Sequence, residues 1–347
     1  MSDYSPFRAG HHYIQKAARP SSNQEMLKIY REQYEEWPRK GILGDFPTHL
    51  DLELSSACNL HCPMCHTLYI DDPSFKKFKE KRLAAALMDF ELFKKAIDEA
   101  VMYGHFYSIK LNLRGESTLH PDIVRYIQYA KQSGVFDIML NTNGNFEPGT
   151  VTKMVEAGLT WLSISLDAIR PETYAKVRAG GNFYSAYASA MEMCQHAGKL
   201  NIQVSFVIQK TNQEEADEFK AFWQRMPVNK IVMADFYNPG ELIKNDAAFA
   251  TQQYERLEKF TCPQLWQRIV IWNDGRMYPC CHSFEGAEDM YLGNLRDITI
   301  HDAWLSPKLQ AIREHHRTGD YSAVATCSKC AYPKQPSKGG VDSIVSG

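Results

Sequence analysis

The sequence has little that would place the chain in a membrane or against a charged polymer. No stretch approaches the roughly 20 consecutive apolar residues that a membrane-spanning helix needs, and residues 1–6 lack the apolar core of a signal peptide. Lys and Arg number 39 against 41 Asp and Glu, which gives no positive field for nucleic acid or anionic lipid. We therefore expect a cytoplasmic protein that binds neither a membrane nor nucleic acid.

The sequence also gives no basis for a framework of disulfide bonds. It contains nine Cys, an odd number grouped by short spacings, and it lacks a signal peptide, so we expect cluster ligands in a reducing compartment. With 347 residues, of which 44% are hydrophobic and 23% charged, the chain is long enough for one large globular domain and a smaller one.

Three of the cysteines, Cys58, Cys62 and Cys65, stand close together, with three residues between the first two and two between the last two. Thiolates hold iron-sulfur clusters, and a short loop must wrap a four-iron cube closely for near neighbours to reach adjacent irons. Three thiolates would leave the fourth iron open. A zinc knuckle also uses Cys pairs two residues apart, but no fourth local ligand completes a zinc set, although His61 and His66 stand nearby.

This spacing resembles the signature of the radical S-adenosylmethionine (SAM) superfamily, although Met64 stands where the superfamily often has an aromatic residue. The resemblance implies that the amino and carboxylate groups of SAM chelate the open iron and that SAM is cleaved to a 5'-deoxyadenosyl radical. It also implies an external electron donor such as flavodoxin or ferredoxin.

Apolar runs of strand length alternate with helical periodicity, which favours an α/β fold of parallel strands joined by crossover helices. We expect six strands, at 50–55, 108–114, 137–142, 161–167, 202–209 and 231–236. Helical patterns lie between them, at 89–103, 121–133, 148–157, 171–178 with 184–197, and 213–225. The pattern alone fits most of a TIM barrel or an open doubly wound sheet. The resemblance implies a partial (β/α)6 TIM-type barrel whose cluster loop follows the first strand.

One segment at the end of the second expected strand resembles a SAM-binding motif. In such barrels the reacting groups lie at the C-terminal ends of the strands. The segment Leu113 to Ser117 resembles the Gly-Gly-Glu-Pro motif that takes the SAM amino group, so Gly115 and Glu116 carry over whereas Arg114 and Ser117 depart from it. The alternative for Glu116 is a solvated loop acid.

The ends of the next three strands resemble segments of the superfamily that contact the ribose or methionine part of SAM. The resemblance assigns this cofactor-binding role to Asn143, Ser165, Asp167 and Gln209. Asn143, Ser165 and Asp167 also fit plain turn and cap chemistry, which is their alternative interpretation.

A second group of cysteines begins at Cys262, which is followed by twelve residues, Gly275, four residues and Cys280, and later by the pair Cys327 and Cys330. This arrangement resembles a SPASM or twitch domain, the C-terminal module that holds auxiliary iron-sulfur clusters. A full SPASM domain has further Cys after the pair, and none follows here. The resemblance therefore implies the shorter twitch pattern, with these four ligands on one auxiliary 4Fe-4S cluster. A structural zinc site with four Cys ligands is the alternative.

Local signals support a compact module between these cysteines. Segments 269–272 and 276–279 flank Asn273-Asp274-Gly275, a hairpin signal that would bring Cys262 near Cys280. Residues 302–317 follow as a helix that Pro307 interrupts, and His315 and His316 are expected at its solvated end.

Two cysteines remain outside both groups. Cys281 directly follows Cys280 and so cannot easily face the same cluster. It could point into the active-site cavity as a hydrogen-atom donor, or it could be a small buried thiol. Cys194 lies in a helical stretch and is expected in the core.

These patterns divide the chain into four parts. We expect an N-terminal helical extension (1–46), a radical SAM partial barrel (47–255), a SPASM/twitch domain (256–335) and a flexible tail (336–347). Residues 22–36 can form an amphipathic helix that caps the barrel or lies in a subunit contact, with Met26, Ile29, Tyr30 and Tyr34 on one side.

The resemblance identifies the machinery rather than the substrate. Single-cluster twitch relatives include dehydrogenases of carbinol carbons in sugar-like or cyclitol molecules, so this small-molecule oxidation leads, with the auxiliary cluster as electron acceptor. The expected substrate pocket lies at the strand ends and comprises Asn112, Arg114, Asp235, Tyr237 and Asn238. Tyr237 or Arg114 would take the hydroxyl proton.

Three other hypotheses remain open. One is a radical epimerase of a sugar or aminoglycoside-like substrate, with Cys281 as hydrogen donor. Another is a maturase that modifies a peptide or protein. The last is a non-catalytic iron-sulfur or zinc scaffold, which predicts no SAM cleavage at all.

Overall fold

The computed structural model describes residues 11–16, 23–68, 87–104, 106–238, 241, 243, 245–251, 254–283, 287–330 and 332–336. A ten-stranded mixed sheet runs in the order β1-β7-β6-β5-β4-β3-β2-β9-β10-β11. Its strands are β1 (His11–Gln15), β2 (His49–Leu52), β3 (Ser108–Lys110), β4 (Asp137–Thr142), β5 (Trp161–Ser165), β6 (Asn201–Ile208), β7 (Lys230–Asp235), β9 (Arg268–Ile271), β10 (Arg276–Tyr278) and β11 (Gly293–Asn294). In a second sheet, β8 (Tyr254–Arg256) pairs with β12 (Lys334–Pro336).

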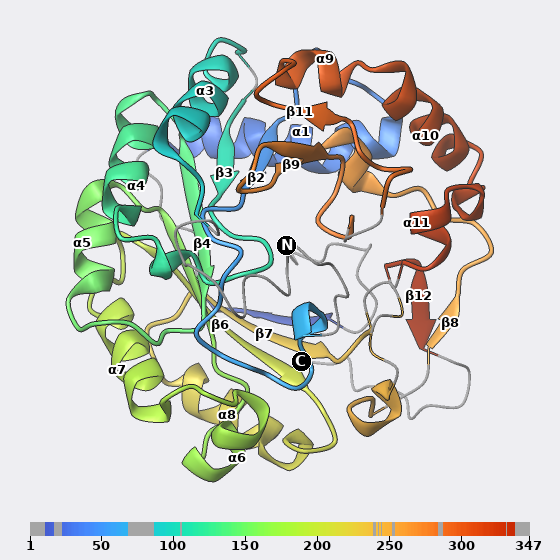
Figure 1. Ribbon diagram of the computed structural model, residues 1–347. Helices are drawn as coiled ribbons and strands as arrows, with labels where there is room; N and C mark the ends of the chain where they lie inside the picture. Colours follow the sequence, from blue (N-terminus) through green and yellow to red (C-terminus); the bar gives the residue numbers. More distant parts are fainter. Residues whose placement is uncertain are drawn as a thin grey trace.

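Strands β2 to β7 form the barrel. They run parallel, and each pairs with the next in sequence. The crossover helices are α3 (Phe90–Ala100), α4 (Ile123–Gln132), α5 (Thr150–Ala157), α6 (Pro171–Val177), α7 (Phe183–Cys194) and α8 (Ala216–Gln224). Figure 1 shows these helices following one another around the outside of the strands. The predicted partial (β/α)6 barrel is therefore confirmed.

Alternation along the strands makes the lumen of this barrel polar. On β2 and just beyond it, Leu50, Leu52 and Leu54 are fully buried in the core between the sheet and its outer helices. Successive strand residues face opposite sides, so His49, Asp51 and Glu53 point into the lumen. Their side chains contact Ser108, Arg268 and Arg114, respectively, on or just beyond the strands next to β2.

The C-terminal region continues the barrel sheet. Strand β9 pairs in parallel with β2, and β10 and β11 add to it antiparallel, so the predicted hairpin docks on the first barrel strand. Helices α9 (Ile300–Trp304), α10 (Pro307–Arg317) and α11 (Ala325–Ser328) run from the top to the right-hand side of Figure 1, and α9 lies beside α3. The interruption predicted at Pro307 is a full break, because Ser306 caps α10 and Pro307 opens it.

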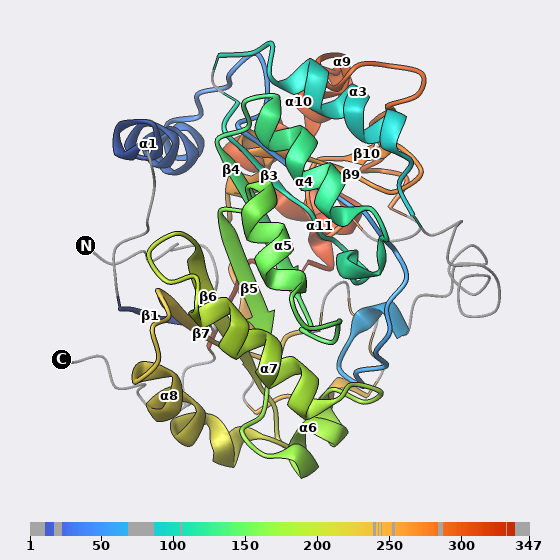
Figure 2. The same ribbon diagram turned by 90° about the vertical axis from the view of Figure 1, so that its left-hand side faces the viewer.

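Helix α1 (Gln24–Lys40) covers the end of the barrel where the strands begin. Its Leu27 and Tyr30 pack on Tyr107, which directly precedes β3. In Figure 2, α1 lies on the left of the sheet, whereas the blue segment that follows β2 lies on the right. The helix thus caps the barrel, as one of the two predictions for it states. Ile29 was predicted on the packed side but is 37% exposed, and Leu27 takes that position.

Other expectations for the ends of the chain are only partly met. The segment predicted as a helical extension also contains β1, which pairs antiparallel with β7. The predicted flexible tail begins within β12 at Pro336, and residues 337–347 lie outside the described residues. Within the described ranges no helix is long and apolar enough to cross a bilayer.

Replacing Leu27 with Ala should weaken the docking of α1. Leu27 is 6% exposed, and truncating a buried Leu usually costs about 2–5 kcal/mol. We expect the free energy of unfolding, measured by urea denaturation, to fall by about 2–3 kcal/mol on that basis. Ile29→Ala on the same helix is the matched control and should change it by about 0.5 kcal/mol or less. Equal losses in the two variants would contradict the packing described here.

Candidate functional site

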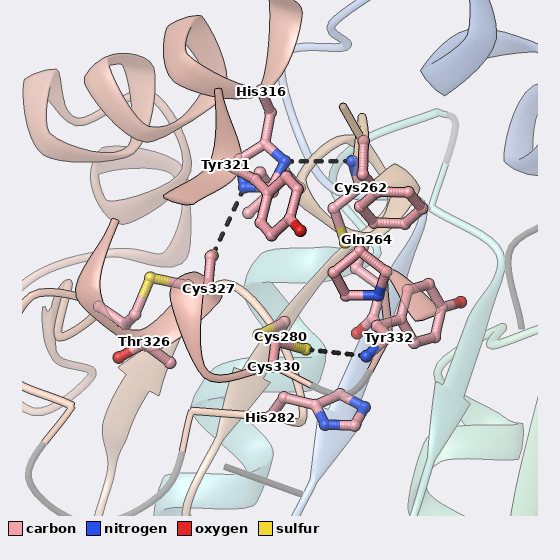
Figure 3. A pocket seen from close by; sticks show the side chains of 14 residues that line it. Cys262, Gln264, Cys280, His282, His316, Tyr321, Thr326, Cys327, Cys330 and Tyr332 are labelled. Carbon is pink, nitrogen blue, oxygen red and sulfur yellow. Dashed lines mark hydrogen bonds between the residues drawn. The ribbon is translucent and has the colours of Figure 1, made fainter. Parts of the chain in front are cut away.

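The four cysteines predicted to hold an auxiliary cluster line one cavity. They come from separate segments. Cys262 precedes a short 3-10 turn, Cys280 follows β10, Cys327 lies in α11 and Cys330 follows α11. Figure 3 shows Cys280, Cys327 and Cys330 around this cavity, with Cys262 beside His316. The hairpin and α11 therefore bring together thiols that are up to 68 residues apart in the sequence.

The chemistry of this donor set fits an iron-sulfur cluster. Burial, together with the neighbouring thiols, raises the pKa of Cys280 to about 12 and also raises the pKa values of Cys262 and Cys327. Four thiolates around one cavity would repel one another without a positive centre, and metal ligation supplies that centre. Among the described His, Cys, Asp and Glu side chains, no group of three surrounds a single-ion position.

His316 belongs to this cavity, and the prediction of a solvated helix end is wrong for it. It is 1% exposed, because α10 turns Leu309, Ile312, Arg313 and His316 inward. The backbone N–H of Cys262 donates to Nδ1 of His316 (3.2 Å), and Nε2 lies 3.4 Å from Sγ of Cys327. Burial lowers the pKa of His316 to about 4, so the imidazole is neutral near pH 7. The helical spacing of these four residues was the signal that sequence reasoning missed.

The first cysteine triplet lies in the loop after β2. The loop is closed by a hydrogen bond from the N–H of Cys65 to the carbonyl of Cys62 (2.9 Å), and the N–H of Leu60 lies 3.5 Å from Sγ of Cys58. Burial raises the pKa of Cys58 to about 12, with further contributions from Glu116 and the other two thiols. These thiols are therefore close enough to interact and need a positive partner to ionise.

Gly115 and Glu116 hold this loop against the barrel. A Cβ atom at Gly115 would lie 2.4 Å from the carbonyl oxygens of Ser55 and Ala57, so only glycine fits there. Glu116 is 3% exposed, which rules out the solvated alternative. Its carboxylate accepts hydrogen bonds from the hydroxyl of Thr142 (2.7 Å) and the N–H of Asn143 (2.8 Å) at the end of β4. Binding of the SAM amino group by Glu116 stays a prediction.

Asn143 and Asp167 lie beside the triplet, on the loops after β4 and β5. Nδ2 of Asn143 is 3.9 Å from Sγ of Cys58. Asp167 is fully buried and forms an ion pair with Arg178 (2.5 Å), whose charge counteracts the effect of burial on the pKa of Cys62. The structure thus gives both residues partners around the cluster loop.

Ser165 and Gln209 lie farther along the same edge of the barrel. Ser165 accepts a hydrogen bond from the hydroxyl of Ser205 (3.1 Å). Gln209 is 2% exposed, and within the described residues its Nε2 has no hydrogen-bond partner. Buried polar atoms are rarely left unpaired, so Gln209 fits a position that donates to a bound ligand.

Arg114 is held in a buried ion pair rather than placed for proton transfer. Its Nε and Nη2 donate to the two carboxylate oxygens of Glu53 (2.8 and 2.6 Å), and its guanidinium lies 3.6 Å from the centre of the Trp272 ring. A guanidinium in this state has no lone pair with which to accept a proton. The structure therefore gives Arg114 a positioning role and leaves Tyr237 as the predicted proton acceptor.

The other predicted pocket residues divide between the lumen and the loop after β7. Oδ1 of Asn112 accepts the N–H of Asn141 (3.1 Å) between β3 and β4. Asn238 donates to the carbonyl of Ile243 (2.8 Å) and so holds the following loop, and Asp235 ends β7. Tyr237 is 38% exposed, and its ring centre lies 6.0 Å from that of His282, which lines the auxiliary cavity.

The neighbouring residues Cys280 and Cys281 have different surroundings. Sγ of Cys281 lies 3.5 Å from Oε1 of Gln264, a residue that lines the auxiliary cavity, whereas Cys281 itself does not line it. Burial raises the pKa of Cys281, but His282 and the lumen residue Arg268 outweigh this and lower it to about 6. Cys281 therefore lies between the barrel lumen and the auxiliary cavity. Cys194 is buried in the core, as expected.

Comparison with known families agrees with this geometry. A model of the radical SAM superfamily matches residues 52–222, and a model of an iron-sulfur cluster-binding domain matches residues 262–331. The chain belongs to the radical SAM superfamily. Its two domains imply SAM, a 4Fe-4S cluster for SAM cleavage and auxiliary cluster chemistry in the C-terminal domain.

Relatives of known sequence match about half of the chain. A protein of Saccharolobus solfataricus named probable GTP 3',8-cyclase is 28% identical over 191 residues, covering 55% of this chain and 58% of its own length. One of the same name from Methanococcus maripaludis is 30% identical over 156 residues, covering 45% and 48%. The chain thus spans about half the length of these relatives.

Solved structures show the same fold at low identity. BtrN in complex with AdoMet and 2-DOIA is 16% identical, with a TM-score of 0.53 over 82% of this chain and 92% of its own. Streptococcus suis SuiB bound to S-adenosylmethionine is 16% identical, with a TM-score of 0.57 over 84% and 73%. The anSMEcpe protein with bound AdoMet is 14% identical, with a TM-score of 0.58 over 83% and 91%.

Replacing Gly115 with Ala should disturb the segment that leads into Cys58. The added methyl group would collide with two backbone carbonyls, and overpacking of this kind costs about 1–3 kcal/mol. We expect a lower melting temperature and less iron per chain after anaerobic reconstitution. Gly104→Ala is the matched control, because no atom lies within 4 Å of its Cβ position. Full iron loading of the Gly115→Ala variant would contradict this account.

The two cysteine sets should bind iron independently, because they line separate parts of the structure. After reconstitution, about eight irons per chain should fall to about four in a Cys58, Cys62 and Cys65 triple Ala variant. The measurement is iron and acid-labile sulfide per chain. A fall from about four irons to none would mean that the C-terminal cysteines hold zinc or nothing.

Proposed function

We propose that this protein oxidises a carbinol carbon of a sugar-like or cyclitol small molecule. The observation that carries the proposal is the contact between the auxiliary cavity and the expected substrate pocket, because the ring centre of Tyr237 lies 6.0 Å from that of the cavity residue His282. An electron acceptor at this place suits an oxidation. When bound, SAM and the first cluster supply the radical that removes hydrogen from the substrate, and the auxiliary cluster supplies an electron acceptor.

The lumen offers hydrogen-bonding groups suited to a polyhydroxylated molecule. Strand alternation turns amide and hydroxyl side chains inward on neighbouring strands, including Asn112, Asn141, Ser163, Gln203 and Ser205. Within the described residues, Oδ1 of Asn141 is buried without a hydrogen-bond partner. A few convergent polar groups in an enclosed site are what orient a small ligand.

The chain's own residues would then position the substrate and handle its proton. The ion pair between Glu53 and Arg114, stacked on Trp272, forms a rigid wall at the strand ends. Oxidation of an alcohol carbon removes one hydrogen atom, one proton and one electron from the substrate. We assign the proton to the phenolate form of Tyr237, which becomes the phenol when it accepts the proton and which lies on the loop after β7. The first cluster draws its electron from an external donor such as flavodoxin or ferredoxin.

A radical epimerase is the second candidate, and the position of Cys281 favours it. Its thiol lies at the border of the lumen, where it could return a hydrogen atom to the opposite face of the substrate. The product would then regain the hydrogen that oxidation removes. The two reactions therefore differ in whether solvent hydrogen enters the product.

The proposal predicts substrate-dependent SAM cleavage by a small polar alcohol. Reconstituted protein would be incubated anaerobically with SAM, a reductant and a panel of cyclitols, sugars and amino sugars, with GTP and a peptide as comparison substrates. We expect 5'-deoxyadenosine to form at least several-fold faster with one alcohol than without substrate. The Cys58→Ala variant should form none.

Deuterated solvent separates the two candidates in the same assay. Epimerisation places deuterium at the reacting carbon, whereas oxidation yields a ketone without it. The proposal is wrong if none of the alcohols raises the rate of 5'-deoxyadenosine formation above the substrate-free rate. A response to GTP alone or to the peptide alone would identify that class of molecule as the substrate instead.

A further inference from the structure

His316 contacts two of the four cysteines of the auxiliary cavity through its two ring nitrogens. One nitrogen faces the backbone N–H of Cys262 and the other faces Sγ of Cys327 (Figure 3). We propose that His316 donates a hydrogen bond from Nε2 to the Cys327 thiolate and thereby raises the reduction potential of the auxiliary cluster. It is a positioning residue for electron transfer and touches no substrate.

The donor role of Nε2 follows from the hydrogen bond on the other nitrogen. The N–H of Cys262 donates to Nδ1 of His316 (3.2 Å), and a Cys327 thiolate can only accept a hydrogen bond from Nε2, so both contacts favour the same tautomer. A neutral imidazole has one donor and one acceptor, which leaves the proton on Nε2. At 3.4 Å this N–H is within the usual range for a hydrogen bond to sulfur.

The fold holds this arrangement in place. His316 lies on the inward face of α10 with Leu309 and Ile312, and its carbonyl accepts the hydroxyl of Thr261 (2.7 Å). Two other groups contact the cavity sulfurs. The N–H of Tyr332 donates to Sγ of Cys330 (3.3 Å), and the hydroxyl of Ser283 lies 3.4 Å from Sγ of Cys280. Among these contacts, that of His316 comes from a side-chain N–H, so a substitution can remove it without altering the backbone.

The direction of the effect follows from charge. Reduction adds one negative charge to the cluster and its thiolates, so a donated hydrogen bond stabilises the reduced state more than the oxidised one. Hydrogen bonds to the sulfurs are among the factors that set cluster potentials. Loss of the bond should therefore make the auxiliary cluster a weaker electron acceptor.

Redox titration of three variants tests this. The full chain would carry the Cys58, Cys62 and Cys65 triple Ala substitution, so that its EPR signal comes from the auxiliary cluster alone. His316→Asn keeps an acceptor near the Nδ1 position but loses the donor to Cys327. It should lower the equilibrium constant for reduction of the auxiliary cluster about tenfold, which is a fall of about 59 mV in the reduction potential for one electron. His316→Gln can present its amide N–H to Cys327 and should restore most of the potential. His315→Asn is the matched control, because His315 is exposed on the same helix and should leave the potential unchanged.

Within the triple Ala background, equal potentials for the chain with His316 intact and the His316→Asn variant would overturn the proposal. Equal shifts for His316→Asn and His316→Gln would overturn it as well. If His316→Asn fails to hold iron, the test is pulsed EPR on the triple Ala chain with His316 intact and with ¹⁵N-labelled histidine. A nitrogen coupling to the reduced auxiliary cluster supports the hydrogen bond, and its absence overturns it. No substrate enters these measurements, so their outcome is independent of the proposed oxidation.

Discussion

The inward face of strand β2 is the constraint on which both halves of the site depend. Glu53, just beyond the strand, pairs with Arg114 on one side and accepts the N–H of Asn273 on the other. Asp51 holds Arg268 of β9 (3.0 Å). These charges are buried, and leaving one partner unpaired in such a pair typically costs about 3–5 kcal/mol. The pairs therefore fix β3 and β9 on either side of β2, while the chain beyond β2 runs directly into Cys58.

This arrangement explains how the hairpin that carries Cys280 and Cys281, far along the chain from Cys58, comes to lie next to the barrel. The parallel pairing of β9 with β2 sets the hairpin that carries Cys280 and Cys281 at the edge of the barrel. In the bend and turn that follow β10, Cys280 lines the auxiliary cavity, whereas the charge of Arg268 acts on Cys281. A hairpin alone would not do this. The edge of an incomplete barrel is what accepts the extra strand.

The sequence patterns predicted what depends on local periodicity and spacing. The barrel strands and the break at Pro307 lie within a few residues of their predicted places, and the four C-terminal cysteines that were predicted together line one cavity. What was missed depends on contacts between distant segments. Arg114 meets Glu53 across 61 positions, and no local signal marks that pair. His316 was misread because a polar pair at a helix end looks solvated, although its spacing from Leu309 and Ile312 placed it on the buried face.

The same pairing of charges bears on which substrates the lumen suits. The carboxylates of Glu53 and Asp51 are already bound to Arg114 and Arg268, so these two guanidinium groups are committed within the protein. A triphosphate needs several uncommitted cations, because each negative oxygen must be compensated when it leaves water. A neutral polyol needs only amide and hydroxyl partners, which the inward positions of β4, β5 and β6 provide. These contacts of the described residues support the proposed hydroxylated substrate, whereas the relatives of similar sequence are named for GTP.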